Sequence, residues 1–323
     1  MDITGLHHVG LVVPDMAAAI GTFRRLGFRV GPPAYPALPP EAGAAAEPIG
    51  AGNTHADFPR GFVELVALAP ERRERLPDEA RLVPLAIPDE RLAATRAAMR
   101  RTVAGLAARL DRSEGAHILV FAADDAERTA ARLRAAGVEH GGARPAQRPI
   151  TTAAGTELAA IKYLELGDAA SDGMLPEGRI GVAEDAPPEL LDAQTGLDHP
   201  NGALALAECV LCVGEGELES TAERYERLLG TAARGDGDSR AFTLGSGRLT
   251  VTTSAGLAAR LPGERARTVP ALSAYAVDVA DLAAAERLLR GAGVELRRAA
   301  TGEPFVPAAA AHGAAVMLRQ ASA

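Results

Sequence analysis

The stretch of sequence that decides the fold is residues 5–27, GLHHVGLVVPDMAAAIGTFRRLG. Residues 5–13 form a short apolar run that predicts a strand, and the following Pro14 and Asp15 end it. Residues 16–26 carry apolar side chains at helical spacing, and Gly27 follows them as a suitable C-cap. The stretch therefore predicts one strand that leads directly into one helix.

This strand and helix recur three more times along the chain. Further strands are predicted at 116–122, 204–213 and 272–279. A predicted helix follows each of them and ends next to a glycine, and such self-similarity indicates tandem structural units. Each unit then continues through strand and turn signals to a clear last strand, at 61–68, 158–166, 248–253 and 314–319. The sequence thus predicts an α+β protein built from four βαβββ units, two in each half.

Two segments interrupt the repeat. Residues 89–111 predict an amphipathic helix whose apolar face carries Leu92, Met99, Val103, Leu106 and Leu110. We expect this helix to pack on the outside of the sheet, with a lid over the concave face as the alternative. Residues 181–202 are rich in Pro, Gly and Asp, which predicts a linker between an N-terminal domain, 1–180, and a C-terminal domain, 203–323.

The composition excludes several classes of function. The 323-residue chain has a net charge of −8 and only 3% aromatic residues, which argues against nucleic-acid binding through a basic face and stacking platforms. We find no leader peptide and no apolar run of about 18 residues, so we expect a cytoplasmic protein without a membrane span. Its Ala, Arg and Gly usage is typical of bacteria. Cys209 and Cys212 fall on a predicted strand, which favours two buried thiols in a reducing compartment.

Two histidines occupy equivalent places in the first two units. Aligning Asp15 with Asp124, at the helix starts, places His8 and His117 seven residues earlier, near the start of each first strand. His7 should face the opposite side of its strand, and it is the alternative ligand. The other histidines fall in predicted loops or in the linker, with His55 expected to be exposed: His55, His140, His199 and His312.

Two glutamates occupy equivalent places in the last strands of the same units. Aligning residues 61–65 with residues 162–166 matches Glu64 with Glu165. A pseudo-twofold axis between the units would bring both glutamates and both histidines together on the concave face. Imidazole and carboxylate donors suit one divalent ion (Fe, Mn, Ni, Co or Zn) and leave open positions for a substrate. A charged glutamate inside such apolar strands is otherwise costly.

These motifs match a known superfamily residue by residue. Residues 6–15, 62–65, 115–120 and 163–166 resemble the first strands and the ligand-bearing last strands of the vicinal-oxygen-chelate superfamily. The whole pattern is similar to bacterial two-domain glyoxalase-like proteins, which implies two half-barrel domains of the glyoxalase and bleomycin-resistance type. The resemblance to the glyoxalase I branch implies that all four side chains ligate the metal. There the last glutamate, here Glu165, can leave the metal and act as the catalytic base.

The C-terminal half lacks this ligand pattern. Its positions in the same register are Glu208, Thr250, Ala274 and Val316. One acid among four cannot hold a metal, so we expect this half to be a structural partner, a second pocket wall or a homodimer surface. If the units pair differently between the halves, a partner chain would have to complete the site.

The sequence leaves three functions open. The favoured one is a metal-dependent lyase or isomerase that acts on a small oxygenated substrate, where the ion polarises vicinal oxygens and a carboxylate moves a proton. A ring-cleaving or other iron dioxygenase could use the same donors. The third is a non-catalytic, antibiotic-type binding protein for a small molecule. No lysine cluster for phosphate and no Gly-rich dinucleotide loop is present in the sequence.

Overall fold

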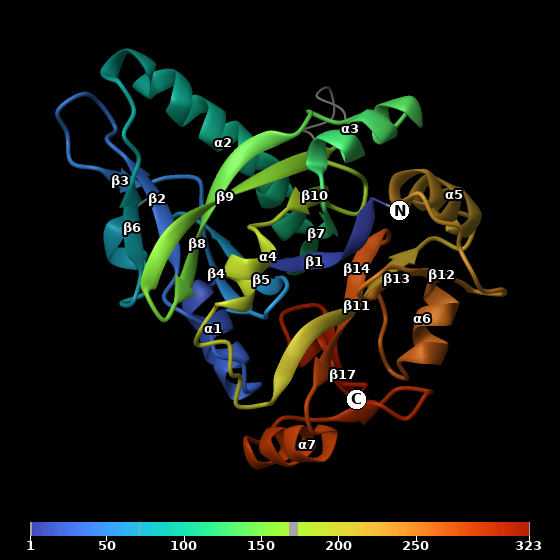
Figure 1. Cartoon of the computed structure of the whole chain (residues 1–323). Coiled ribbons are helices and arrows are strands. Elements are labelled where there is room, and N and C mark those ends of the chain that lie inside the picture. The colour runs from blue at the N-terminus through green and yellow to red at the C-terminus, as the bar shows by residue number, and fades with distance from the viewer. Residues whose placement is uncertain (1, 71, 168–173, 323) are drawn as a thin grey trace.

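A computed structural model describes residues 2–70, 72–167 and 174–322 of the chain (Figure 1). The strands of the N-terminal half are β1 (Ile3–Val12), β2 (Ala34–Leu38), β3 (Glu47–Pro48), β4 (Ala51–Asp57), β5 (Phe62–Leu68), β6 (Arg81–Pro84), β7 (Gly115–Ala123), β8 (Arg144–Thr152), β9 (Gly155–Leu166) and β10 (Arg179–Glu184). Those of the C-terminal half are β11 (Ala203–Val213), β12 (Ser239–Thr243), β13 (Arg248–Thr253), β14 (Ala271–Val279), β15 (Arg297–Arg298), β16 (Pro304–Val306) and β17 (Ala315–Gln320). The helices are α1 (Met16–Arg25), α2 (Asp89–Arg112), α3 (Ala126–Ala135), α4 (Pro188–Asp192), α5 (Leu218–Leu229), α6 (Ser254–Arg260) and α7 (Leu282–Gly291), with short 3-10 turns at Arg73–Arg75 and Ala308–Ala310.

The N-terminal half is built from two units that face each other across a central strand pair. Hydrogen-bonded neighbours give the strand order β8, β9, β10, β7, β1, β5, β4, β2. The first strands of the units, β1 and β7, pair antiparallel in the centre. On either side the last strand of each unit lies parallel to its own first strand, β5 beside β1 and β10 beside β7. The two units are therefore related by a pseudo-twofold axis that runs through the central pair.

The C-terminal half repeats this arrangement. Its strand order is β12, β13, β11, β14, β17, β16, β15, with β11 and β14 antiparallel in the centre. Leu272 on β14 pairs with Ala116 on β7 and joins the halves. Within the described residues the strands form one connected sheet that remains open at its ends. The predicted α+β class and its four repeated units are confirmed.

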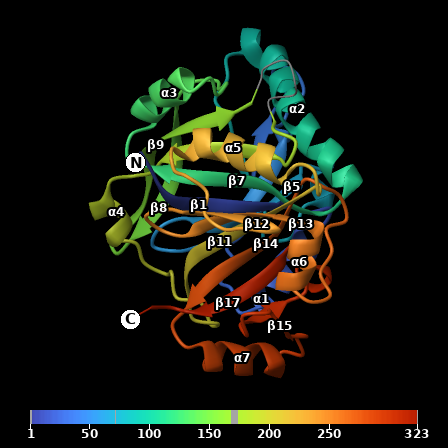
Figure 2. The same cartoon turned by 90° about the vertical axis from the view of Figure 1, so that its right-hand side faces the viewer.

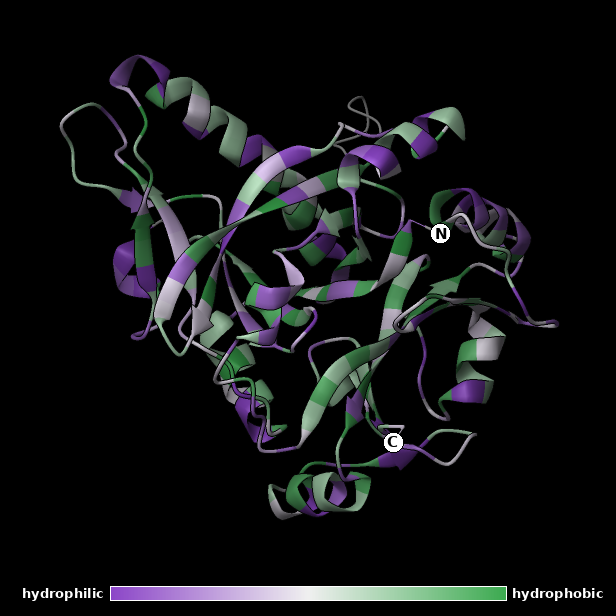
Figure 3. Ribbon diagram, in the orientation of Figure 1, coloured by the Kyte–Doolittle hydropathy of each residue, from purple (hydrophilic) through white to green (hydrophobic). Residues whose placement is uncertain are grey.

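One apolar core is shared by the two halves. Val9, Phe121, Cys209 and Tyr275, one from each first strand, are fully buried in it. Figure 2 shows these four strands together in the middle of the molecule, with helices around them. In Figure 3 helices such as α5 and α7 carry both green and purple segments, as expected for helices that bury one face. The core therefore places the first strand of every unit at the centre of the fold.

Aspartate caps define the register of the units. The side chain of Asp15 accepts a hydrogen bond from the backbone N–H three residues later at the start of α1, and Asp125 does the same for α3. The equivalent of Asp15 in unit two is therefore Asp125, one residue after Asp124. This shift makes His117 the equivalent of His7, and it makes Ile118 the equivalent of His8.

The segment between the halves is tied to unit one. Its first residues, 181–184, belong to β10, so the N-terminal sheet extends into the predicted linker. Further on, His199 accepts the backbone N–H of Arg29 at Nδ1 (3.0 Å) and donates from Nε2 to the carbonyl oxygen of Asp57 (2.9 Å). The imidazole therefore holds the linker against the loops that follow α1 and β4.

Two further expectations concern the environment of the chain. Cys209 and Cys212 are buried free thiols, as predicted, and burial raises the pKa of both. Among the helices described, none is both long enough and apolar enough to cross a membrane.

Candidate functional site

The N-terminal half contains a cavity of about 450 Å³ between its sheet and α2. Its polar lining consists of His8, Asn53, Glu64, Tyr163, Glu165 and Arg179. Its apolar lining includes Val66, Met99, Val103, Leu106 and Ile118. Strands of both units and the inserted helix therefore enclose one space with a polar and an apolar side.

Helix α2 forms the apolar wall of this cavity. Met99, Val103 and Leu106 lie on the side of the helix that lines it, and Leu106 is only 1% exposed. Leu106 packs with Val66 and Ile118 from the sheet. The favoured prediction, a helix on the outside of the sheet, is wrong, because the apolar face of α2 matches apolar side chains on the cavity face instead.

A β-bulge brings two consecutive histidines to the same network. Leu6 pairs with Phe121 and His8 pairs with Val120, so His7 is an extra residue opposite none on β7. A bulge of this kind re-aims a side chain that would otherwise alternate to the other face. His7 Nδ1 consequently lies 2.7 Å from His8 Nδ1, and the prediction that the two imidazoles diverge is wrong.

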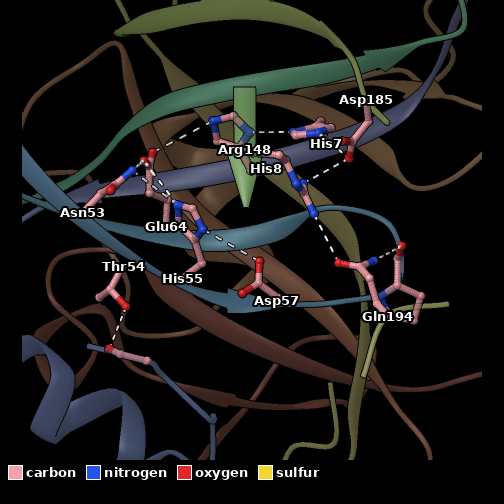
Figure 4. A network of polar contacts seen from close by, with 12 residues as sticks. His7, His8, Asn53, Thr54, His55, Asp57, Glu64, Arg148, Asp185 and Gln194 are labelled. Carbon is pink, nitrogen blue, oxygen red and sulfur yellow. Dashed lines mark hydrogen bonds and ion pairs between the residues drawn. The ribbon is translucent and has the colours of Figure 1, made fainter. Parts of the chain in front are cut away.

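His8 is a neutral imidazole at the polar end of the cavity. Burial, and next the neighbouring His7, lower the pKa of His8 well below its ordinary value. Its ring stacks on Phe62 with the centroids 4.4 Å apart. Its Nε2 lies 3.9 Å from Oε2 of Glu64, which is outside hydrogen-bonding distance (Figure 4).

Glu64 is an ionised carboxylate on β5. Burial alone would raise the pKa of Glu64, but the imidazole of His55 and the amide of Asn53 hold it at about 2. The Asn53 side chain donates to Oε1 at 2.8 Å, and His55 Nε2 lies 3.7 Å from the same oxygen. Asn53 and His55 come from β4, the antiparallel neighbour of β5. The carboxylate is therefore oriented by two side chains that alternate along one strand.

His55 belongs to this network and is not an exposed loop residue. It lies on β4 directly opposite Glu64, and its ring stacks on Phe62 with the centroids 4.2 Å apart. Burial alone would lower the pKa of His55, but Glu64 and Asp57 outweigh burial and raise it. Phe62 is thus flanked by His55 on one neighbouring strand and by His8 on the other.

His117 lies away from the cavity. Gly10 pairs with Ile118 and Leu11 pairs with Ala116, so His117 is the bulged residue of β7. Its Nε2 donates to the backbone oxygen of Ser113 at 2.8 Å, and its side chain lines a separate cavity of about 300 Å³ between the two halves. The sequence alignment placed it one residue out of register, because it took Asp124 as the cap of α3.

Glu165 lines the same cavity as His8 and Glu64 and lies on the predicted strand, but this strand is not the last one of unit two. It lies on β9, whose neighbour β10 is the actual last strand of unit two. In unit one, Glu64 on β5 pairs with Gly10 on β1. The equivalent pair in unit two is Gly181 on β10 with Val120 on β7, so Gly181 is the equivalent of Glu64. The Glu165 carboxylate forms an ion pair with Arg179 at 2.8 Å and is 40% exposed.

The sequence of the chain carries a family signature over most of its length. Residues 6–230 match the sequence model of the glyoxalase-like domain. The chain belongs to the glyoxalase-like domain family. No curated protein sequence matches it at a significant level.

Solved structures share the glyoxalase-like fold over nearly the whole chain. A hypothetical protein from Staphylococcus aureus is 8% identical with a TM-score of 0.55, and the match covers 98% of this chain and 99% of that one. The Mn(II)-bound glyoxalase from Novosphingobium aromaticivorans is 14% identical with a TM-score of 0.52, over 98% and 82%. An extradiol ring-cleaving dioxygenase from B. fuscum is 11% identical with a TM-score of 0.51, over 100% and 73%. The fold is that of the vicinal-oxygen-chelate superfamily.

The donor set of this glyoxalase-like chain does not fit the predicted four-ligand metal centre. Of the four predicted ligands the cavity receives His8, Glu64 and Glu165, and Glu165 is engaged by Arg179. Unit two offers Ile118 and Gly181 at the positions equivalent to His8 and Glu64, and neither side chain can ligate a metal. Across the part of the chain that the structure describes, no three His, Cys, Asp or Glu side chains converge closely enough to hold an ion. Catalytic metal sites use three protein ligands or more.

In the C-terminal half, the place of His8 is taken by a buried ion cluster. Glu208 is fully buried and accepts hydrogen bonds from Thr250 and from three arginines, Arg248, Arg260 and Arg319. In unit four, Ala274 on β14 is equivalent to His8. Ala276 pairs with Met317 on β17, so Met317, and not the predicted Val316, is equivalent to Glu64. The ion pairs of Glu208 with the three arginines therefore occupy the face of the C-terminal sheet that corresponds to the cavity face of the N-terminal sheet.

Proposed function

We propose that this chain binds a small, partly apolar organic molecule in the cavity beneath α2 and moves a proton on it with His8 and Glu64. The proposal keeps the proton transfer expected from the sequence but assigns it to these two side chains without a metal. The support is the donor set at the polar end of the cavity, where the imidazole of His8 faces the carboxylate of Glu64.

One observation carries the proposal: the imidazole of His8 and the carboxylate of Glu64 face each other at the polar end of the cavity. His8 Nε2 and Glu64 Oε2 are 3.9 Å apart. A neutral imidazole whose Nδ1 carries the proton offers a lone pair at Nε2, and an ionised carboxylate offers only lone pairs. A hydroxyl, N–H or activated C–H group of a bound molecule would satisfy both. The polar end of the cavity is therefore suited to a group that can give up a proton.

The two groups have different roles because they differ in charge. With a pKa of about 2, Glu64 stays ionised and is a weak base. His8 is neutral and can accept a proton, after which the adjacent carboxylate would stabilise the imidazolium. We assign proton uptake to His8 and electrostatic stabilisation to Glu64.

The cavity limits the size and character of the molecule. Its volume of about 450 Å³ lies within the usual range for small-molecule sites, about 300–1,000 Å³. Met99, Val103 and Leu106 offer an apolar surface opposite the polar end. A ligand with an apolar ring or chain and one proton-donating group would use both sides.

A base-sensitive probe tests binding and proton transfer separately. In 5-nitrobenzisoxazole, removal of the ring C–H proton breaks the N–O bond and yields a coloured cyanophenolate. Val103→Trp, which fills the cavity, should weaken binding of the probe by about tenfold or more, while Val83→Trp at a side chain 46% exposed should not. His8→Phe should retain binding and lose about a hundredfold in turnover. Equal turnover by His8→Phe contradicts the proton-transfer role, and equal binding by both tryptophan variants contradicts the site.

Ligand binding without chemistry is the second candidate. The loss of donors at Ile118 and Gly181 favours it, because a protein that only sequesters a molecule needs no metal ligands. It predicts that Val103→Trp abolishes binding while the parent protein shows no turnover above that of free imidazole. The dioxygenase alternative needs an iron held by two histidines and one carboxylate, and among the described residues no three such side chains converge on one point.

A further inference from the structure

A chain of buried side chains leads from His8 into the protein. His7 Nδ1 lies 2.7 Å from His8 Nδ1, and His7 Nε2 lies 3.1 Å from Oδ2 of Asp185 (Figure 4). The side chains of His7 and Asp185 are 5% and 13% exposed. The bulge in β1 supplies His7, and the residue after β10 supplies Asp185, so both units contribute to the chain.

The carboxylate of Asp185 is held from several sides. Arg148 donates to Oδ2 at 3.0 Å, and the backbone N–H of Ala186 donates to Oδ1 at 2.7 Å. Burial alone would raise the pKa of Asp185, but the hydrogen bond and electrostatic effect of His7, and next the charge of Arg148, lower it. Asp185 is therefore an ionised acceptor in a fixed orientation.

The hydrogen-bonding rules then determine where the imidazole protons lie. An ionised carboxylate can only accept, so His7 must carry a proton on Nε2. In the state in which His7 is uncharged, its Nδ1 offers a lone pair, and His8 then donates to it from its own Nδ1. This leaves Nε2 of His8 without a proton, facing the cavity. The arrangement of the buried groups thus selects the tautomer of the one imidazole that reaches the cavity.

We infer that His7 and Asp185 are positioning residues that keep His8 Nε2 free to accept a proton and that take up the resulting charge. The inference rests on the proposed function of His8. In the step, the ligand loses a proton to His8 Nε2 and keeps the electron pair as an anion. The Nδ1 proton of His8 shifts to Nδ1 of His7, and the positive charge rests on His7 beside Asp185. The resting state returns when the Nδ1 proton shifts back to His8 and the Nε2 proton leaves, either to water after the anionic product has departed or back to the bound product.

Nitrogen NMR of the full chain tests the inference without any ligand. In protein labelled with ¹⁵N-histidine, at about two pH units above the ordinary histidine pKa, His8 should show a protonated Nδ1 and a bare Nε2. His7→Gln preserves one acceptor and one donor and should retain this signature. His7→Phe preserves bulk but removes both hydrogen bonds, and His8 should then populate the Nε2–H form. A protonated Nε2 in the parent protein, or an unchanged tautomer in His7→Phe, would overturn the inference.

Turnover of 5-nitrobenzisoxazole supplies the second readout. His7→Phe should lose about tenfold or more in kcat with KM unchanged, and His7→Gln should recover much of that loss. Asp185→Asn retains an acceptor but removes the charge, so it should keep the His8 tautomer and lower kcat. Equal kcat in all three variants contradicts the inference. A parent protein with the predicted tautomer but no turnover contradicts the proposed reaction and supports the tautomer selection, so the two failures are distinguishable.

Discussion

Replacing Glu208 by glutamine tests whether the C-terminal face is a structural ion cluster. The carboxylate is fully buried and receives hydrogen bonds from Arg248, Arg260, Arg319 and Thr250. Glu208→Gln preserves the size of the side chain but leaves three guanidinium groups with no negative partner at that point. Breaking a buried ion pair by removing one partner costs about 3–5 kcal/mol. Because the arginine side chains are 18–38% exposed and regain some hydration, we expect the lower end, about 3 kcal/mol.

Urea unfolding gives the measurement, with an exposed ion pair as the matched control. Glu219 pairs with Arg240 but is 66% exposed, so Glu219→Gln should cost less than about 1 kcal/mol. The Glu208→Gln midpoint should fall well below that of the control at an unchanged slope. Probe binding in the N-terminal cavity should be unchanged in both variants. A Glu208→Gln variant as stable as the control would refute the assignment of this cluster as a structural element.

Three further predictions concern the cavity and the linker. A Cβ at Gly10 would lie 2.9 Å from Oε2 of Glu64 and 2.9 Å from Cβ of Ile118, so Gly10→Ala should cost about 1–3 kcal/mol in a thermal melt and weaken probe binding. Gly21→Ala, with open space around it, should be neutral or stabilising. Leu106→Ala should cost about 2 kcal/mol in urea unfolding because the residue borders the cavity, whereas Leu158→Ala, at a side chain 65% exposed, should cost almost nothing. Burial lowers the pKa of His199 below 6.5, so the stability it contributes is complete above that pH and declines as pH falls below it. His199→Gln should reduce the loss of unfolding free energy between about pH 7 and pH 5, and an identical pH dependence in both proteins would contradict this.

The repeated units could be predicted from sequence because each one repeats the same physical pattern. An apolar strand and a helix closed by glycine recur four times, with an aspartate cap in three of the four units, and the structure places these elements as the pattern indicates. The first strand is apolar on both faces in every unit, which is the sequence signature of a strand at the centre of the core. The places of His8 and Glu64 in the cavity could be predicted for the same reason, since Asp15 is the only aspartate between β1 and α1 and leaves no choice of register in unit one.

Register in unit two could not be predicted, because two aspartates stand at the helix start. Asp124 and Asp125 are both plausible caps, and a one-residue choice moves a strand position to the opposite face. Glu165 was misplaced for a related reason: its apolar surroundings resemble a last strand, while the true last strand, β10, lies in a segment read as linker. A signal for the missed residues was present in β4, where Asn53, His55 and Asp57 alternate with buried side chains. The contribution of Asp185 depends on a contact across 178 residues, which spacing cannot indicate.

The four units carry different side chains at one equivalent position, which directly follows a bulge in the first strand of each unit. A bulge occurs near that point in each first strand, at His7, His117, Ala207 and Ser273. The residue after the bulge is His8, Ile118, Glu208 or Ala274, so the same backbone geometry carries an imidazole, two apolar side chains and a carboxylate. Only in unit one is the bulged residue, His7, able to accept a proton from the residue after it, His8, while it also contacts a carboxylate, that of Asp185. The inserted helix α2 closes an apolar wall opposite that same unit. The proton transfer proposed for His8 and the apolar wall formed by α2 thus fall at the same one of four equivalent positions. This is the arrangement expected if the chain acts on a bound molecule there and uses its other three positions to hold the fold together.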